Sequence, residues 1–157
     1  MQFRYFPGPR IAFAAIPLLF LSSLCQAATV PATPAPDSPQ AIQEYVQTQL
    51  AIWKLRLDLM DWKVSLVFSH PPQLGPKKMG DVEWDQAAKT AVIRVMDPAD
   101  YRLSPEDTRK DMEFTVLHGL IHLELASLPR NKRNAEREEL AVSQLADALL
   151  RLDRGTK

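Results

Sequence analysis

The chain has 157 residues, a length that suits one compact domain. Its 19 basic side chains match its 19 acidic ones, so the charge gives no reason to expect nucleic acid or an anionic membrane as a partner. With a single cysteine, the chain has no disulfide framework of its own.

Residues 1–27 predict a secretory signal peptide. Two arginines and no acid precede the almost wholly apolar residues 11–24, and small residues follow, with cleavage expected after Ala27 or Ala28. A membrane helix needs roughly 20 apolar residues, whereas this run is shorter and contains a proline and two serines. A lipoprotein anchor at Cys25 is disfavoured by the large leucine before it. A secreted or periplasmic protein without a stable membrane span is therefore expected.

Cleavage at that point would leave a mature chain without thiols. Loss of Cys25 excludes cysteine metal ligands and a cysteine nucleophile. Removing Arg4 and Arg10 from the 19 basic side chains leaves 17, against 19 acidic ones. The mature chain would therefore remain close to neutral.

The folded domain is expected to span residues 39–157. Before it, residues 28–38 are rich in proline and predict an extended linker. Ser38 then provides a helix N-cap, with a proline at the first helical position. Apolar residues at helical spacing predict an amphipathic helix over residues 39–59.

The middle of the chain is rich in β-forming residues. It predicts strands over residues 62–68, 81–85 and 90–96. A loop rich in proline and glycine follows the first strand, and the turn-like residues 86–89 indicate that the other two form a hairpin.

Two helices are expected to complete the domain. The first covers residues 105–127 behind a Ser104 cap, and the second covers residues 133–152. Strands and helices segregated in this way indicate an α+β fold. We expect a small antiparallel sheet of about three strands, backed by helices.

Two of the three histidines lie four residues apart within the apolar residues 115–123. On a helix, this spacing puts the imidazoles of His118 and His122 on one side, where they can bind one metal ion. The alternative is two core histidines with hydrogen-bond partners. Two of only three histidines at ligand spacing favour the metal site. The third, His70, lies in the proline-rich loop and is expected to be solvated.

A zinc site needs a third protein ligand. The strongest candidates are Glu136, Glu138 and Glu139, at the start of the last helix. That helix must pack against the histidine helix to bury its leucines, and the two can run antiparallel. An acidic first turn is also favoured by the helix dipole, an alternative that suits Glu136 best. Glu138 and Glu139 both border the apolar face, so periodicity leaves both open.

These segments resemble the small gluzincin-like zinc metallopeptidases, which belong to the zincin, or HExxH, type. Residues 115–125 resemble the histidine helix of that family, and residues 139–150 resemble its ligand helix. The predicted strands at 82–85 and 90–95 are similar to its short strands. Only the paired histidines and the later glutamate are specific features.

The resemblance implies zinc as the cofactor and a peptide or protein as the partner. His118, His122 and Glu139 would be the zinc ligands, with water as the fourth. The strand near residues 91–95 would border a peptide-binding cleft. The implied domain architecture is zincin-like.

Gly119 departs from the family's pattern. The HExxH motif has a glutamate there, which activates the metal-bound water and contributes about 10²–10⁴ in rate. Glu113 and Glu124 are expected to point away from the histidine face, and only Glu138 could reach the site from the last helix. Glycine within a helix costs about 1 kcal/mol relative to alanine, but it also permits another backbone segment to approach closely.

The sequence therefore predicts a secreted, zinc-binding, metallopeptidase-like protein whose peptide hydrolysis is impaired or absent. One alternative is a non-catalytic module of the cell envelope that holds peptides or proteins in the zincin-like cleft. Another is a helix-rich envelope domain without metal. Metal content separates this last alternative from the others, and peptide hydrolysis by the natural chain and by Gly119→Glu separates the first two.

Overall fold

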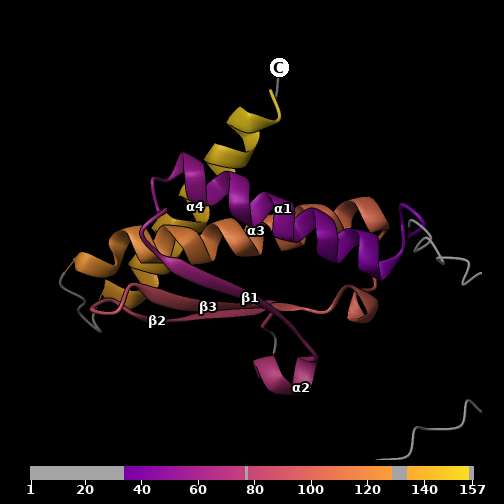
Figure 1. The fold of residues 1–157 in the computed structure, drawn as a ribbon, viewed down its shortest axis with the longest axis horizontal. Coiled ribbons are helices and arrows are strands. Elements are labelled where there is room, and N and C mark those ends of the chain that lie inside the picture. The colour runs from indigo at the N-terminus through magenta and orange to yellow at the C-terminus, as the bar shows by residue number, and fades with distance from the viewer. Residues whose placement is uncertain (1–33, 77, 129–133, 156–157) are drawn as a thin grey trace, which may run out of the picture. The chain divides into compact units, whose positions relative to one another are not determined.

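The computed structural model describes residues 34–76, 78–128 and 134–155, which form an α+β unit (Figure 1). The α+β class is therefore as expected. The predicted signal peptide, residues 1–27, and the first part of the predicted linker lie outside the described residues. Within the described residues, no helix combines the length and the apolar character that crossing a membrane requires.

The first helix, α1 (Pro39–Arg56), begins where the sequence places it. The hydroxyl of Ser38 accepts a hydrogen bond from the backbone N–H of Ala41 at 3.2 Å, which confirms the predicted N-cap. The helix ends three residues earlier than expected. Asp58 has a positive φ of 53°, a left-handed conformation that cannot continue an α-helix.

The sheet is mixed, which corrects the expectation of an antiparallel one. Its strands are β1 (Lys63–Ser69), β2 (Gly80–Asp85) and β3 (Thr90–Met96), in the spatial order β1-β3-β2. The hairpin of β2 and β3 is antiparallel as predicted, but β1 pairs in parallel with β3. After β1 the chain reverses direction, and β2 runs antiparallel to β1 without pairing with it. Strand β3 then lies between β1 and β2 and pairs with both.

A short helix, α2 (Pro71–Leu74), occupies part of the loop after β1. The prolines of this segment predicted a loop. Here Pro71 takes the first helical position, where the missing N–H costs nothing, and the helix begins at that residue.

The remaining helices are α3 (Pro105–Glu124) and α4 (Ala135–Asp153). The Ser104 hydroxyl accepts a hydrogen bond from the backbone N–H of Asp107 at 3.1 Å, so this predicted cap is also confirmed. A 3₁₀ turn, Leu125–Ser127, extends α3 to the predicted end.

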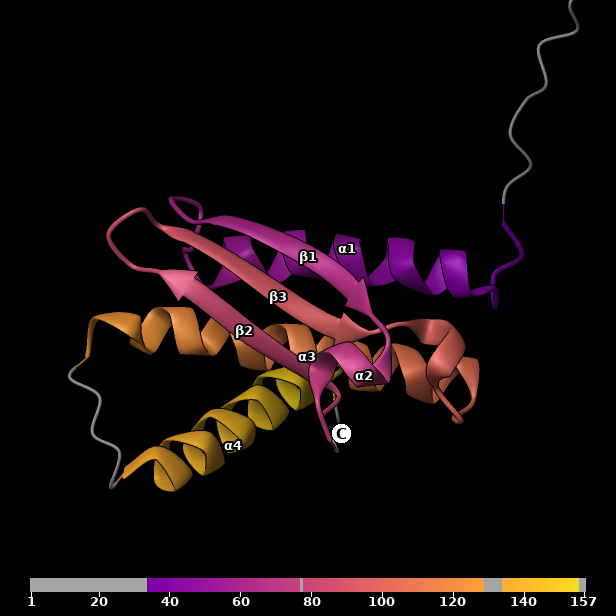
Figure 2. The ribbon, with the colours of Figure 1, turned by 90° about the horizontal axis from the view of Figure 1, so that it is seen from below.

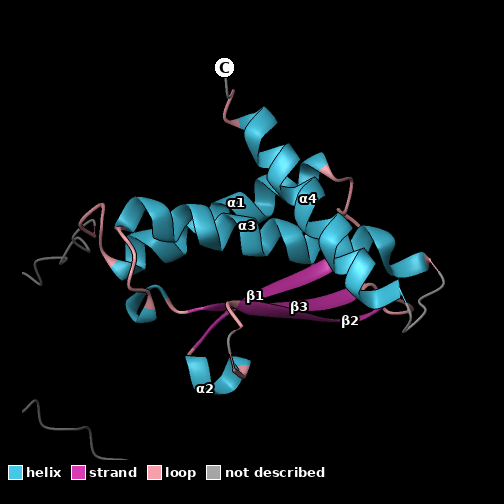
Figure 3. Cartoon of the chain, turned by 180° about the vertical axis from the view of Figure 1, so that it is seen from behind, coloured by secondary structure: helices cyan, strands magenta, loops and turns pink. Residues whose placement is uncertain are grey.

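Helices α1 and α3 cover one face of the sheet, whereas α2 lies beyond its other face (Figures 1 and 3). Helix α4 crosses α3 on the side of β2 (Figure 2). The core lies where these layers meet. Its fully buried large side chains come from α1, β3, α3 and α4: Val46, Ile93, Val95, Met112, Val116, Leu117, Leu120, Ile121 and Val142.

Gly80 lets the start of β2 lie directly on α3. A Cβ at this position would be 2.4 Å from Cγ2 of Thr115 and 2.5 Å from the carbonyl oxygen of Arg94, distances that real Cβ atoms do not reach. Only glycine fits this approach. Since Thr115 lies one turn before His118 on α3, the contact places β2 beside the histidines.

Candidate metal centre

Helix α3 presents the two histidines from its buried side. His122 is only 4% exposed, and its neighbours Leu120, Ile121 and Leu123 belong to the core. The four-residue spacing directs both rings to one point, where the Nε2 atoms of His118 and His122 are 3.1 Å apart. The predicted convergence of the two imidazoles is therefore present.

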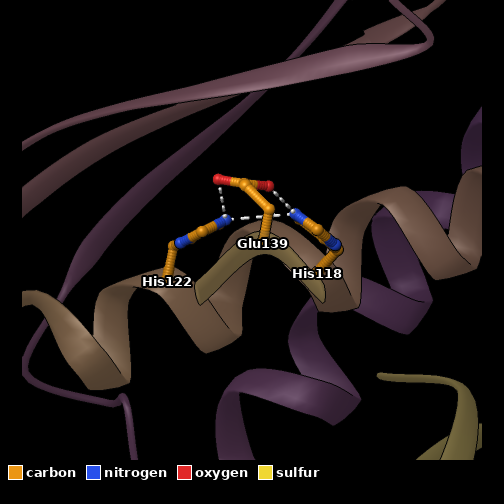
Figure 4. Close-up of side chains that lie close together, drawn as sticks. All are labelled: His118, His122 and Glu139. Atoms are coloured by element: carbon orange, nitrogen blue, oxygen red, sulfur yellow. Dashed lines mark hydrogen bonds and ion pairs between the residues drawn. The ribbon is translucent and has the colours of Figure 1, made fainter. Parts of the chain in front are cut away.

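Glu139 on α4 completes the group. One of its carboxylate oxygens lies 3.2 Å from Nε2 of His118, and the other lies 3.2 Å from Nε2 of His122. Figure 4 shows the carboxylate facing both rings from the opposite helix. These three side chains form a group of the kind that can hold a metal ion.

The distances among the three side chains fit a small divalent cation. Nitrogen and oxygen ligands at about 2.0–2.1 Å from a tetrahedral zinc ion lie about 3.3 Å from one another. The two Nε2 atoms are 3.1 Å apart, and each lies 3.2 Å from a different carboxylate oxygen of Glu139, so each of these separations is near that spacing. With one donor atom taken from each residue, the three donors lie within 4.8 Å of one another. Two neutral imidazoles and one carboxylate are also a donor set that zinc accepts.

Glu138 takes a different place from Glu139. Its carboxylate lies 3.6 Å from Nδ1 of His122, on the far side of the ring from the shared centre. On the other histidine, the Ser143 hydroxyl lies 3.5 Å from Nδ1 of His118. Glu138 and Ser143 therefore lie behind the rings, where they can orient them. Of the two glutamates that periodicity left open, Glu139 is the one in the group that could hold a metal ion.

The surroundings of His118 favour the neutral form of its imidazole, the form that binds metal. Burial and the adjacent His122 ring lower the pKa of His118, an effect that Glu139 partly offsets. The imidazole of His118 is therefore neutral near pH 7. Trp84 of β2 stacks on His122, with ring centroids 6.4 Å apart and planes 15° apart, and limits the rotation of that ring.

A cavity of about 500 Å³ opens beside the three side chains. Strand β2 lines one wall of it, mainly through Val82 and Trp84, and α3 lines another through Phe114 and Thr115. The expectation that the strand near residues 91–95 borders the cleft is wrong. That segment belongs to β3, the central strand of the sheet, and none of its residues lines the cavity, whereas residues of the edge strand β2 do.

Gly119 lies on the cavity wall, with Ile93 of β3 directly beneath it. A Cβ at position 119 would be 3.2 Å from Cδ1 of Ile93 and 3.4 Å from its Cγ1. The close approach suggested by the glycine is thus made by a side chain of the sheet rather than by backbone. Ile93 packs into the space next to the α3 backbone that a side chain at position 119 would enter.

Neither carboxylate that lines this cavity is placed as a general base. Glu139 faces the two imidazoles, and Asp81 accepts a hydrogen bond from the Arg94 guanidinium at 2.9 Å. Glu124 is exposed, and Glu113 is buried and hydrogen-bonded to side chains of α1 and to Arg154 at the end of α4. Both positions agree with the expectation that these carboxylates point away from the histidine face.

Two other residues considered from the sequence lie outside the group. Nδ1 of His70 is 2.7 Å from Asp100, whose carboxylate raises the pKa of this exposed ring. Glu136 is exposed at the start of α4. Glu113 was not predicted to have a role in the fold or the site. Its place three and four residues before the buried Val116 and Leu117 was a signal that it faces the core.

Comparisons of the chain with protein-family models, with curated proteins and with solved structures find no match.

Proposed function

We propose that this chain is a zinc-binding, gluzincin-like protein that holds peptides but hydrolyses them poorly or not at all. The observation that supports it is the convergence of His118, His122 and Glu139 from two helices on one point. The leader predicted from the sequence would place the protein outside the cytoplasm, in a secreted or periplasmic form.

Different residues of the chain would bind the metal ion and orient its ligands. His118, His122 and Glu139 would hold zinc, which acts as a Lewis acid and lowers the pKa of a coordinated water to about 7. Glu138 and Ser143 would orient the rings. Because a glycine stands where the motif has its glutamate, no residue of the histidine helix removes a proton there, and a factor of about 10²–10⁴ in rate is lost.

The cavity supports peptide binding. Strand β2 lies at an edge of the sheet, so the backbone groups on its outer side are not paired with β1 or β3. An extended peptide can add to such an edge by main-chain hydrogen bonds, while its side chains enter the adjacent cavity. This feature also favours the second candidate function, a non-catalytic module of the cell envelope that binds peptides or proteins.

The proposal is tested by giving the zinc-loaded natural protein a mixture of unstructured peptides. We expect some peptides to bind, with no more hydrolysis than a His118→Ala/His122→Ala variant shows. Hydrolysis at the rate of an ordinary peptidase, abolished by a chelator, would contradict the loss of the base. Absence of both binding and hydrolysis would contradict the role of the cavity.

Glu138→Gln tests the support of His122. An outer carboxylate that orients a histidine ligand typically contributes ten- to hundredfold in metal affinity, so we expect a loss of that size in a zinc competition titration. Glu136→Gln is the matched control, because Glu136 is exposed on the same turn of α4. A much larger loss for Glu138→Gln than for Glu139→Gln would show that Glu138 is itself the ligand.

A further inference from the structure

Glu113 is a buried carboxylate that does not line the cavity. It lies on α3 and is only 2% exposed. Its two oxygens accept hydrogen bonds from the Tyr45 hydroxyl at 2.9 Å, from Nε1 of Trp53 at 3.0 Å and from the Arg154 guanidinium at 2.9 Å. The donors come from α1 and from the C-terminal end of α4, so one side chain joins three helices.

Arg154 supplies the positive charge in this cluster. A buried carboxylate is costly unless it is paired and hydrogen-bonded, and the tyrosine and tryptophan donors are neutral. Burial and Glu113 raise the pKa of Tyr45 to about 12, so its hydroxyl remains a donor at all ordinary pH values. Glu113 thus accepts hydrogen bonds from two neutral donors on α1 and from one cation, the Arg154 guanidinium at the end of α4.

Helix α4 has little else to fix its direction. Among its described residues only Val142, Ala146 and Leu150 are buried. The polar contacts described between α4 and the rest of the domain fall into two groups. Glu138, Glu139 and Ser143 lie at the histidines, and Arg154 lies at Glu113, beside an exposed pair between Asp153 and Arg56. Glu139 and Arg154 are about 22 Å apart along the helix, at 1.5 Å per residue.

We propose that Glu113 is a positioning residue of the metal site. By receiving Arg154, it fixes the angle at which α4 crosses α3, and that angle sets Glu139 opposite the two imidazoles. The three buried apolar side chains of α4 alone would allow it to rotate and slide on α3. The contact between Arg154 and Glu113, four turns away from Glu139, prevents this movement. The inference rests on the proposed metal-binding function.

The test uses Arg154→Met in the full chain, with Arg151→Met as the matched control. Arg151 lies on the same helix and pairs with Asp147 at the surface, so its loss removes a charge without touching Glu113. The apparent affinity for a metal falls in proportion to the fraction of molecules with the site assembled. We expect zinc to bind Arg154→Met about fivefold or more weakly than it binds Arg151→Met.

Hydrogen exchange separates positioning from a general loss of stability. In metal-free Arg154→Met we expect faster exchange of the amides at residues 138–142 than in the control, and little change in α1. Glu113→Gln should act in the same direction, and the double variant should lose less than the sum of the two single losses, because both act on one contact.

Zinc affinity of Arg154→Met within twofold of the control would overturn the inference, whatever its melting temperature. If the natural chain binds no zinc, the proposed function fails, but the exchange experiment still decides on the contact. Faster exchange in α4 of Arg154→Met would support the role of Glu113 in placing that helix, and unchanged exchange would overturn it.

Discussion

Gly119→Glu combined with Ile93→Val is expected to raise zinc-dependent peptide hydrolysis by about 10²–10⁴-fold over the natural chain. The first change puts a carboxylate on the helix between the two histidines, at the wall of the cavity. The second removes the Cδ1 atom of Ile93, which would lie 3.2 Å from the new Cβ. Initial rates with a fluorogenic peptide, with and without chelator, measure the gain.

The matched control is Gly119→Gln with the same Ile93→Val change, because glutamine has the size of glutamate but cannot act as a base. It should bind zinc and remain inactive. Gly119→Glu alone is expected to gain less activity, since Ile93 is 1% exposed and has little room to yield. Equal rates for the glutamate and glutamine variants would contradict the idea that the missing base limits hydrolysis.

Zinc is expected to stabilise the natural protein strongly against unfolding, and His122→Ala is expected to remove that effect. A ligand that binds only the folded state stabilises it by about 4 kcal/mol when its free concentration is a thousand times Kd. His122 provides one of three converging donors and is almost fully buried, so its loss should abolish most of the zinc-dependent rise in Tm. Thermal melts at several zinc concentrations measure the effect.

His70→Ala is the control for this experiment. It makes the same chemical change at the histidine that lies beside Asp100, outside the group. Its zinc-dependent rise in Tm should match that of the natural protein. A His122→Ala variant that keeps the full rise would show that the stabilising zinc binds elsewhere.

Local signals in the sequence predicted much of this structure. Ser38 and Ser104 both cap helices through their hydroxyls, and residues 86–89 do connect an antiparallel hairpin. The pairing of β1 was not accessible in the same way. Whether a strand joins the near or the far edge of a hairpin depends on long-range packing, which no local pattern contains.

The sequence also predicted part of the candidate metal site, namely the two histidines and the helix that carries the third donor. The spacing of His118 and His122 fixes their convergence on any helix, and a later acidic helix could supply the third donor. Choosing between Glu138 and Glu139 required the crossing of α4 over α3, because adjacent helical residues differ by only about 100° in direction. The contact of Ile93 with Gly119 likewise joins a strand and a helix that no periodicity relates.

The buried network around Glu113 was only partly predictable from the sequence. An acid among the apolar positions of α3 is costly in a core unless it has partners. Its partners Tyr45, Trp53 and Arg154 lie at least 41 residues away along the chain, so the sequence could indicate the need but not the donors.

The most direct test of the metal centre is an anomalous diffraction measurement at the zinc edge, on crystals grown with one equivalent of zinc. We predict a single strong peak about 2.0–2.1 Å from Nε2 of His118, from Nε2 of His122 and from a carboxylate oxygen of Glu139. A strong peak away from these three side chains, or none near them at full zinc loading, would contradict the proposed site.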